Sequence, residues 1–403
     1  MAAEYTIRKP VLAYSTSDPG VRCSFVVARL SRVEQSAGAF SSTLYLTFIG
    51  GARVHWTETR TERRHGQRGS HSINVTENYT SEEIYFNNSV YVIPKGYTET
   101  VLPAGDHSFL FTFSIPSNLP SSFEGSFGYI RYTIKATLDR PWKFNQDTKV
   151  ALTVLAYRDL NMYPQLRTPL ILGNTKTICC WCCQSAPMAI TARVPFTGVV
   201  PGQDVPLIVE LDNPTSVDIT SVQCYLMQES IFYARGKSRT ETRKLGELTL
   251  DPVGKHSSHT AQKTMRMPSC PPTLDINCGI IKIHYFIEIN YHKELNFDFR
   301  LWVRVCYVLQ CKATTSGAHM NLYVATPLTV GTVPLIFQQN WEPLPPGQDG
   351  PPTVPPTAPP YPDLPPPSYD ECVFGAISIR EDEDSEHTYG QKQFSPRYPT
   401  YNL

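Results

Sequence analysis

The sequence predicts an all-β protein, and three observations lead to that prediction. Apolar residues alternate with polar ones at a period of two, as in Phe109, Phe111 and Phe113, rather than at helical spacing. Each alternating run is short and ends at Gly, Pro, Asn or Ser, which is typical of antiparallel sandwiches rather than of strand–helix–strand units. The composition agrees, because charged residues make up only 18% while the chain contains 35 Pro and 22 Tyr.

The alternating runs fall into two sets, which we interpret as two β-sandwich domains. The first set fills residues 1–160 and the second fills residues 187–338. Each span is about the size that one sandwich needs for its own core. Residues 161–186 contain Pro164, Pro169 and Gly173 without alternation, and we therefore predict an inter-domain linker there.

The final segment, residues 339–403, has a different composition. Fifteen prolines lie in the 63 residues from Trp341 onward, and apolar content falls after Pro345. Chain entropy is then expected to outweigh burial, which predicts a disordered Pro-rich tail. The acidic run Glu381–Glu386 is interpreted as a solvating stretch of that tail.

Composition and motif searches favour a cytosolic protein that is not an enzyme. The chain opens without a signal-peptide pattern and has no apolar run of about 18 residues, so its 11 cysteines are expected to be thiols. The formal net charge of zero gives no global electrostatic argument for binding nucleic acid. Phosphate-loop, dinucleotide, zinc-protease and nucleophile-elbow motifs were not found, so neither catalysis nor a cofactor is predicted.

Several motifs of both halves together resemble one known family. The first half contains Leu102-Pro103-Ala104-Gly105-Asp106-His107, Pro120-Ser121-Ser122-Phe123-Glu124-Gly125, Ile130-Arg131-Tyr132 and Asp139-Arg140-Pro141-Trp142. The second half contains Cys179-Cys180-Trp181-Cys182-Cys183, Val200-Pro201-Gly202, Asp212-Asn213-Pro214 and Pro327-Leu328-Thr329-Val330-Gly331-Thr332. These motifs resemble the two domains of the arrestin domain-containing proteins, in the α-arrestin branch. The resemblance implies two arrestin-like, immunoglobulin-like sandwiches.

The tail contains a Pro-Pro-x-Tyr motif, made by Pro366, Pro367 and Tyr369. Consecutive prolines preset a polyproline II backbone, so little ordering entropy is lost when a WW domain takes the prolines in its aromatic groove and the Tyr in a separate pocket. The alternative is Pro-rich filler. The family resemblance implies that the ligand is a WW-domain HECT-type ubiquitin ligase.

Three further groups of residues are weaker candidate sites. Tyr361, Pro362 and Leu364 fit a Tyr-Pro-x-Leu pattern that recruits endosomal-sorting accessory proteins, or are incidental spacing in a Pro-rich run. A predicted loop from Thr57 to Gly69 carries four arginines for phosphates or acidic cargo, or is a solvated hairpin tip; they are Arg60, Arg63, Arg64 and Arg68.

The third group is a cysteine cluster with overlapping Cys-x-x-Cys spacings, formed by Cys179, Cys180, Cys182 and Cys183. Zinc is disfavoured, because adjacent cysteines on a strand point to opposite faces and no second pair has zinc-ribbon spacing. S-palmitoylation near a membrane is a second alternative. We favour a structural strand start, and we predict no metal site.

The resemblance implies an adaptor that links membrane-protein cargo, such as receptors or transporters, to the ligase. The expected outcome is cargo ubiquitination, endocytosis and endosomal sorting, with peripheral recruitment to plasma membrane and endosomes. Two alternatives stay open: a thioredoxin-binding redox regulator acting through Cys278, and a ligase-independent, retromer-like sorting subunit, which would have no use for Tyr369.

One internal repeat departs from the family pattern. The segment 281–288 recurs 22 residues later as 303–310, with matching hydrophobic, basic, Tyr and polar positions. Either copy is able to fill one ladder position of the second sandwich, with four residues facing the core: Ile281, Ile283, Tyr285 and Ile287, or Val303, Val305, Tyr307 and Leu309. We favour a duplicated strand over chance similarity between two β-rich segments. One copy then pairs in the sheet, and the other is an added edge strand or a poorly ordered insert.

Overall fold

The structure, a computed structural model, confirms the all-β class. It describes residues 4–6, 21–31, 43–66, 69–93, 107–139, 144–176, 179–180, 183–184, 187–216, 218–219, 221–292, 323–336, 367–381 and 384–402. Within these ranges the helical elements are two 3₁₀ turns, η1 (Leu160–Met162) and η2 (Pro164–Arg167). None of the helices in the described ranges has the length and apolar character needed to span a membrane.

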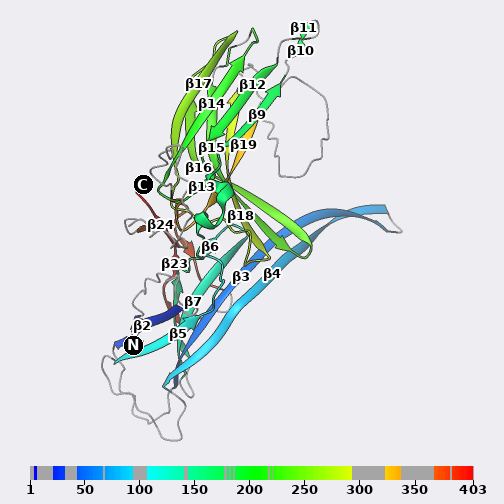
Figure 1. The fold of residues 1–403 in the computed structure, drawn as a ribbon. Coiled ribbons are helices and arrows are strands. Elements are labelled where there is room, and N and C mark those ends of the chain that lie inside the picture. The colour runs from blue at the N-terminus through cyan, green and yellow to red at the C-terminus, as the bar shows by residue number, and fades with distance from the viewer. Residues whose placement is uncertain are drawn as a thin grey trace, which may run out of the picture.

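The N-terminal sandwich pairs a large sheet with a small one (Figure 1). The large sheet has the order β22-β8-β7-β3-β4, with β6 also on β7: β22 (Thr388–Gly390), β8 (Gln146–Leu152), β7 (Gly128–Asp139), β3 (Thr43–Gly66), β4 (Gly69–Ile93) and β6 (Phe123–Glu124). The small sheet has the order β1-β2-β5: β1 (Glu4–Thr6), β2 (Val21–Ser31) and β5 (His107–Ile115). The rings of Phe48 and Phe113 stack with centroids 4.1 Å apart and join the two sheets in the core.

The β3–β4 hairpin corrects the prediction of a loop from Thr57 to Gly69. β3 continues to Gly66, β4 starts at Gly69, and the hairpin extends away from the two sandwiches (Figure 1). Polar side chains form hydrogen bonds between the two strands. The Thr57 hydroxyl donates to Asn78 Oδ1 at 3.1 Å, and the Thr61 hydroxyl donates to Asn74 Oδ1 at 2.9 Å. Such cross-strand pairs stabilise the ladder where β3 is polar, so the polar sequence of the β3 side alone suggested a loop.

The C-terminal sandwich has sheets of four and five strands. The first has the order β17-β14-β12-β9: β17 (Ser257–Arg266), β14 (Asp204–Asn213), β12 (Met188–Val194) and β9 (Leu170–Lys176). The second has the order β13-β19-β18-β15-β16: β13 (Gly198–Val199), β19 (Tyr323–Val330), β18 (Ile281–His292), β15 (Ser221–Ala234) and β16 (Lys237–Leu250). Strand β9 comes from the segment predicted as a linker, and it pairs with β12 from Leu170↔Val194 to Lys176↔Met188. The linker prediction is therefore wrong for this part of the segment.

The first copy of the repeat occupies the central position between β15 and β19, as strand β18. Its predicted core-facing residues are all buried: Ile281, Ile283, Tyr285 and Ile287 are each 2% exposed or less. The second copy, residues 303–310, lies outside the described residues.

Aromatic and charged contacts fix the junction between the two sandwiches. Phe232 of β15 is fully buried between two N-terminal rings, with centroids 6.2 Å from Phe123 and 5.8 Å from Phe127. Arg158 reaches across to Asp275 through two hydrogen bonds of 2.6 and 3.0 Å. These bonds make a bidentate charged pair, which adds geometric specificity to the apolar contact.

The prediction of a disordered tail does not hold for residues 367–381 and 384–402. They form strands β20 (Ser368–Glu371), β21 (Ile377–Ser378), β22, β23 (Gln393–Phe394) and β24 (Arg397–Thr400). Figure 1 shows these segments lying along the N-terminal sandwich and beside the junction. Residues 337–366 lie outside the described residues.

We predict that Ile287→Ala destabilises the protein, because it leaves a cavity at a fully buried position in a central strand. The expected loss in free energy of unfolding is about 2–5 kcal/mol, measured by urea denaturation. The matched control is Leu309→Ala, at the corresponding position of the second copy, which is expected to have a much smaller effect. The opposite ranking of the two variants would show that the second copy fills the ladder.

Candidate functional site

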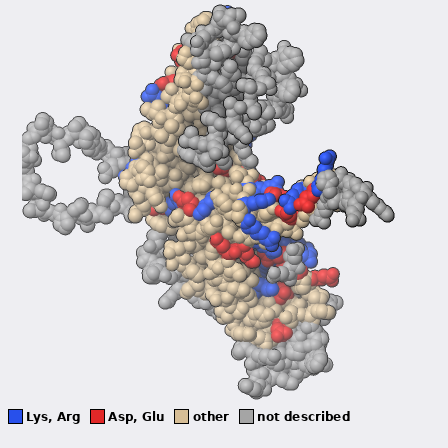
Figure 2. Space-filling view, turned by 90° about the vertical axis from the view of Figure 1, so that its right-hand side faces the viewer, with Lys and Arg blue, Asp and Glu red and all other residues tan. Residues whose placement is uncertain are grey.

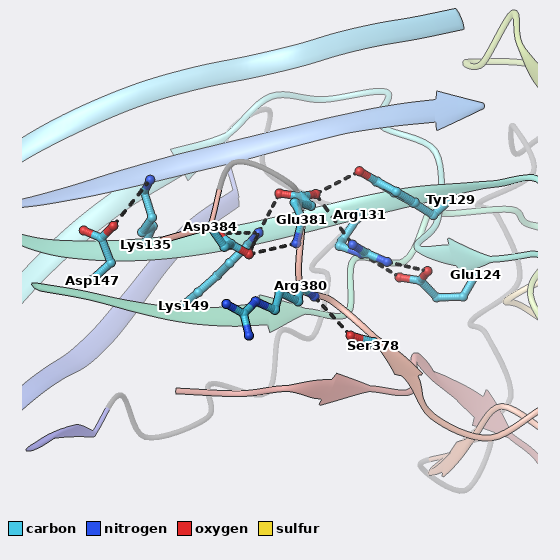
Figure 3. Close-up of polar contacts among 10 residues, drawn as sticks. All are labelled: Glu124, Tyr129, Arg131, Lys135, Asp147, Lys149, Ser378, Arg380, Glu381 and Asp384. Carbon is cyan, nitrogen blue, oxygen red and sulfur yellow. Dashed lines mark hydrogen bonds and ion pairs between the residues drawn. The ribbon is translucent and has the colours of Figure 1, made fainter. Parts of the chain in front are cut away.

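The tail binds the N-terminal sandwich through a charged cluster at β6, β7 and β8 (Figure 3). The Lys149 ammonium donates to Glu381 Oε2 at 2.6 Å and to Asp384 Oδ2 at 3.2 Å. The Tyr129 hydroxyl donates to Glu381 Oε1 at 2.8 Å, and the Asp384 carboxylate accepts from the Glu381 backbone N–H at 2.9 Å. Groups of the sheet thus hold both carboxylates, and the Glu381 backbone also holds the carboxylate of Asp384.

A second cation in this cluster has partners from both the body and the tail. Arg131 donates Nε and Nη2 to the two Glu124 oxygens at 2.9 Å each, and its Nη1 lies 3.6 Å from Glu381 Oε1. Its guanidinium also lies over the Tyr129 ring, 3.8 Å from the centroid. The Arg131 and Glu124 side chains are each only 5% exposed, so each needs the other to offset desolvation.

The electrostatics favour an ionised Glu381. Burial alone would raise the pKa of this carboxyl group, but the hydrogen bond and charge of Lys149, together with Tyr129 and Arg131, outweigh burial and place the pKa below its usual range. Lys149 is itself 5% exposed. Its carboxylate partners among the described residues both come from the tail. Docking of the tail therefore offsets the cost of burying this ammonium.

Backbone pairing extends the docked segment along the edge of the large sheet. Strand β22 runs parallel to β8, from Thr388↔Asp147 to Gly390↔Lys149. Further on, Ile379 and Phe394 pack on Ala151 in a small buried cluster. The acidic run predicted to be a solvating stretch is thus part of an ordered contact, at least at Glu381 and Asp384.

The Pro-Pro-x-Tyr motif lies where the described part of the tail begins. Pro367 is half-buried, and Tyr369 is 36% exposed in strand β20, which pairs with β24. Pro366 lies outside the described residues. So do Tyr361, Pro362 and Leu364 of the second tail motif.

Three of the four arginines in the predicted cationic group lie in strand β3. Arg60 is exposed and pairs with Glu62 at 2.7 Å and with Glu77 at 3.1 Å. Arg63 is exposed in β3, the side chain of Arg64 lies outside the described residues, and so does Arg68. Figure 2 shows acidic and basic side chains interspersed across the middle of one face rather than a patch of one sign. Binding of acidic cargo by these arginines stays a prediction.

The cysteine cluster forms a short strand pair, β10 (Cys179–Cys180) and β11 (Cys183–Gln184). Cys180 lies directly opposite Cys183 in this antiparallel pair. Cys182 and the side chains of the other three cysteines lie outside the described residues. The structural role that the sequence suggests for this cysteine cluster therefore stays a prediction.

Sequence reasoning missed Lys149, Glu381 and Asp384 because the partners are far apart in the chain. Lys149 is 232 residues from Glu381, and neither position belongs to a motif that predicts the pairing. One signal was present in the sequence. An acidic run followed by the scattered aromatics Phe394, Tyr398 and Tyr401 is unusual for a chain that stays in solvent.

We predict that Glu381→Gln weakens docking of the tail and leaves the two sandwiches folded. The variant loses the charged hydrogen bond to Lys149, which is worth about 1.5–3 kcal/mol for a charged group. Hydrogen exchange at residues 388–390 is expected to accelerate by about tenfold or more, because each 1.4 kcal/mol is a factor of ten.

The control for this variant is Glu386→Gln, which changes an exposed carboxylate of the same acidic run. It should leave exchange at residues 388–390 unchanged. Equal exchange rates in both variants and the wild type would contradict a stabilising role for Glu381.

Comparison with known proteins identifies the family to which the two sandwich domains belong. The arrestin (or S-antigen) N-terminal domain matches residues 35–161, and the arrestin (or S-antigen) C-terminal domain matches residues 184–335. Arrestin domain-containing protein 17 of Caenorhabditis elegans is 24% identical over 420 aligned residues, which cover 89% of this chain and 90% of that protein.

Two other relatives align over shorter spans. Arrestin domain-containing protein 4 of Homo sapiens is 30% identical over 201 residues, covering 49% of this chain and 47% of that protein. Arrestin domain-containing protein 1 of Mus musculus is 29% identical over 211 residues, covering 52% of this chain and 47% of that protein. The alignments thus span about half the length of these two relatives. The two arrestin domains together match more than half of the chain, which belongs to the arrestin domain-containing (α-arrestin) proteins.

Proposed function

We propose that the protein is an adaptor that links membrane-protein cargo to a WW-domain HECT-type ubiquitin ligase. Membership of the arrestin family supports an adaptor role in trafficking in general, since arrestins are scaffolds rather than enzymes. The observation that carries the specific proposal is the Pro-Pro-x-Tyr motif behind two arrestin domains, at Pro366, Pro367 and Tyr369. The proline pair and the Tyr two positions later match the groove and pocket of a WW domain.

The proposed mechanism is an increase in effective concentration. A scaffold that holds cargo on its sandwiches and a ligase on its tail turns the encounter between ligase and cargo lysines into an intramolecular one. Docking of Glu381 and Asp384 on Lys149 suits this mechanism, because it keeps the nearby motif close to the body rather than at the end of a long tether. Ubiquitination, internalisation and endosomal sorting of receptors or transporters would follow.

The adaptor is proposed to work in the cytoplasm, with peripheral recruitment to the plasma membrane and endosomes. Cargo-bound arrestin domains and a ligase would bring it there. Tyr361, Pro362 and Leu364 provide a candidate contact for endosomal-sorting accessory proteins at the same membranes.

The environment of Cys278 argues against the thioredoxin-binding alternative. This thiol is 4% exposed, and burial raises its pKa above the usual value. A nucleophilic cysteine needs an accessible thiolate, which burial disfavours. The retromer-like alternative gives no role to Tyr369, so binding experiments on the motif separate it from the adaptor.

We predict that a peptide of residues 360–375 binds a WW domain selective for Pro-Pro-x-Tyr, and that Tyr369→Ala abolishes most of this binding. The Tyr ring fills a pocket that Ala leaves empty, so isothermal titration calorimetry should give a dissociation constant weaker by about tenfold or more. Ser368→Ala at the variable position of the motif is the matched control and should bind as the wild-type peptide does. A wild-type peptide that fails to bind would contradict the ligase-adaptor function.

A further inference from the structure

One edge of the WW-binding motif is paired with another part of the tail. Strand β20 aligns antiparallel with β24, with Ser368 opposite Thr400, Tyr369 opposite Pro399 and Asp370 opposite Tyr398. The Ser368 hydroxyl also lies 2.5 Å from the Thr400 hydroxyl, and the Cys372 N–H donates to the Pro396 carbonyl at 2.8 Å. Ser368 and Tyr369 of the motif are thus part of a two-stranded ladder.

The same segment also contacts the C-terminal sandwich at Ser269. The Ser269 hydroxyl donates to the Asp370 carbonyl at 2.9 Å, and the Val373 N–H donates to the Ser269 carbonyl at 3.1 Å. The segment from Tyr369 to Val373 therefore contacts both β24 and the body.

Strand β24 is itself fastened to both domains by two tyrosines. Tyr398 is 1% exposed and donates its hydroxyl to the Ser122 carbonyl of the N-terminal domain at 2.9 Å. Tyr401 is 8% exposed and donates its hydroxyl to the Thr332 carbonyl of the C-terminal domain at 2.8 Å.

The body is shaped for close approach of this strand. The Tyr401 N–H donates to the Pro201 carbonyl at 2.9 Å. A Cβ at the next residue, Gly202, would lie 2.3 Å from the Tyr401 carbonyl oxygen, so only glycine allows the contact. Two buried aromatic anchors and a backbone contact make β24 a fixed partner for the motif.

A WW domain requires the motif in a different state. Its groove takes the prolines as a polyproline II segment, and its pocket encloses a Tyr ring that here is only 36% exposed beside Pro399. The side chains of β20 are exposed, but its pairing with β24 and the bonds at Ser269 hold the backbone as a β-strand, so binding in the groove requires this backbone to leave its partners.

We propose that β24 is an internal cover for the Pro-Pro-x-Tyr motif, and that a WW domain binds the full chain only when β24 is released. The proposal rests on the ligase-adaptor function and describes how that site is regulated. The intrinsic affinity of the motif is then reduced by the fraction of molecules in which the cover is open. Any partner that displaces β24 from Ser122 or Thr332 would increase that fraction and couple its own binding to recruitment of the ligase.

The test compares the affinity of one WW domain for three molecules: the 360–375 peptide, the full chain, and the full chain with Tyr398→Ala and Tyr401→Ala. The full chain is expected to bind at least about tenfold more weakly than the peptide, and the double variant is expected to recover most of that difference. The matched control is Tyr389→Ala, which removes an exposed tail tyrosine (40% exposed) and should bind as the wild-type chain does.

Hydrogen exchange provides a second readout that does not depend on the double variant folding. In the wild-type chain, saturating WW domain is expected to accelerate amide exchange at residues 397–401, because β24 loses its partner strand.

The outcomes distinguish the cover from the underlying function. Equal affinity of the peptide and the wild-type chain, or unchanged exchange at residues 397–401 in the complex, would overturn the cover. A peptide that does not bind the WW domain would instead overturn the ligase-adaptor function.

Discussion

Two buried cations that need carboxylate partners organise the contact between the tail and the rest of this protein. Arg131 has Glu124 beside it in the N-terminal sandwich, whereas Lys149 pairs with Glu381 and Asp384, 232 and 235 residues further along the chain. A buried ammonium without a counter-charge is strongly destabilising, so the sheet and the tail depend on each other. Three further contacts of the tail come after Glu381 and Asp384 in the sequence. They are strand β22, the small cluster around Phe394, and the tyrosine contacts of β24.

The tail also changes how the two domains are connected. Phe232 and the Arg158–Asp275 pair join the sandwiches directly, and the tail adds a second connection through Ser122 on one side and Thr332 on the other. The motif in β20 lies within this connection. Cargo-induced movement of one sandwich relative to the other would therefore reach the motif through β24, which gives the proposed adaptor a physical route from cargo binding to ligase recruitment.

The sequence was sufficient for the features that depend on local pattern. Alternation predicted the all-β class and gave Ile281, Ile283, Tyr285 and Ile287 as one of two candidate sets for the core face of a strand, and the motifs indicated the family. The sequence was insufficient where hydrogen bonds between strands, rather than burial of apolar side chains, stabilise an element. It was also insufficient where the interacting residues are far apart in the chain. The outer part of β3 is polar on both faces and resembles a loop until Thr57 and Thr61 meet Asn78 and Asn74 of β4. Strand β9 has no alternation of apolar and polar residues along its length, and antiparallel pairing with β12 holds it in the sheet. In the tail, the apolar anchors Ile379, Phe394, Tyr398 and Tyr401 are spaced without a period, so composition alone predicted disorder.

The most direct measurement is to ask whether the tail stays bound when its covalent link is cut. A protease site inserted at Val354, within the Pro-rich stretch, separates residues 1–354 from a C-terminal fragment, and gel filtration then reports whether the fragments co-elute. The account predicts co-elution at neutral pH, with dissociation when Glu381→Gln is combined with Tyr398→Ala, because the charged contact and a buried anchor are both lost. Immediate separation of the wild-type fragments would contradict a docked tail, and with it the dependence of Lys149 on Glu381 and Asp384.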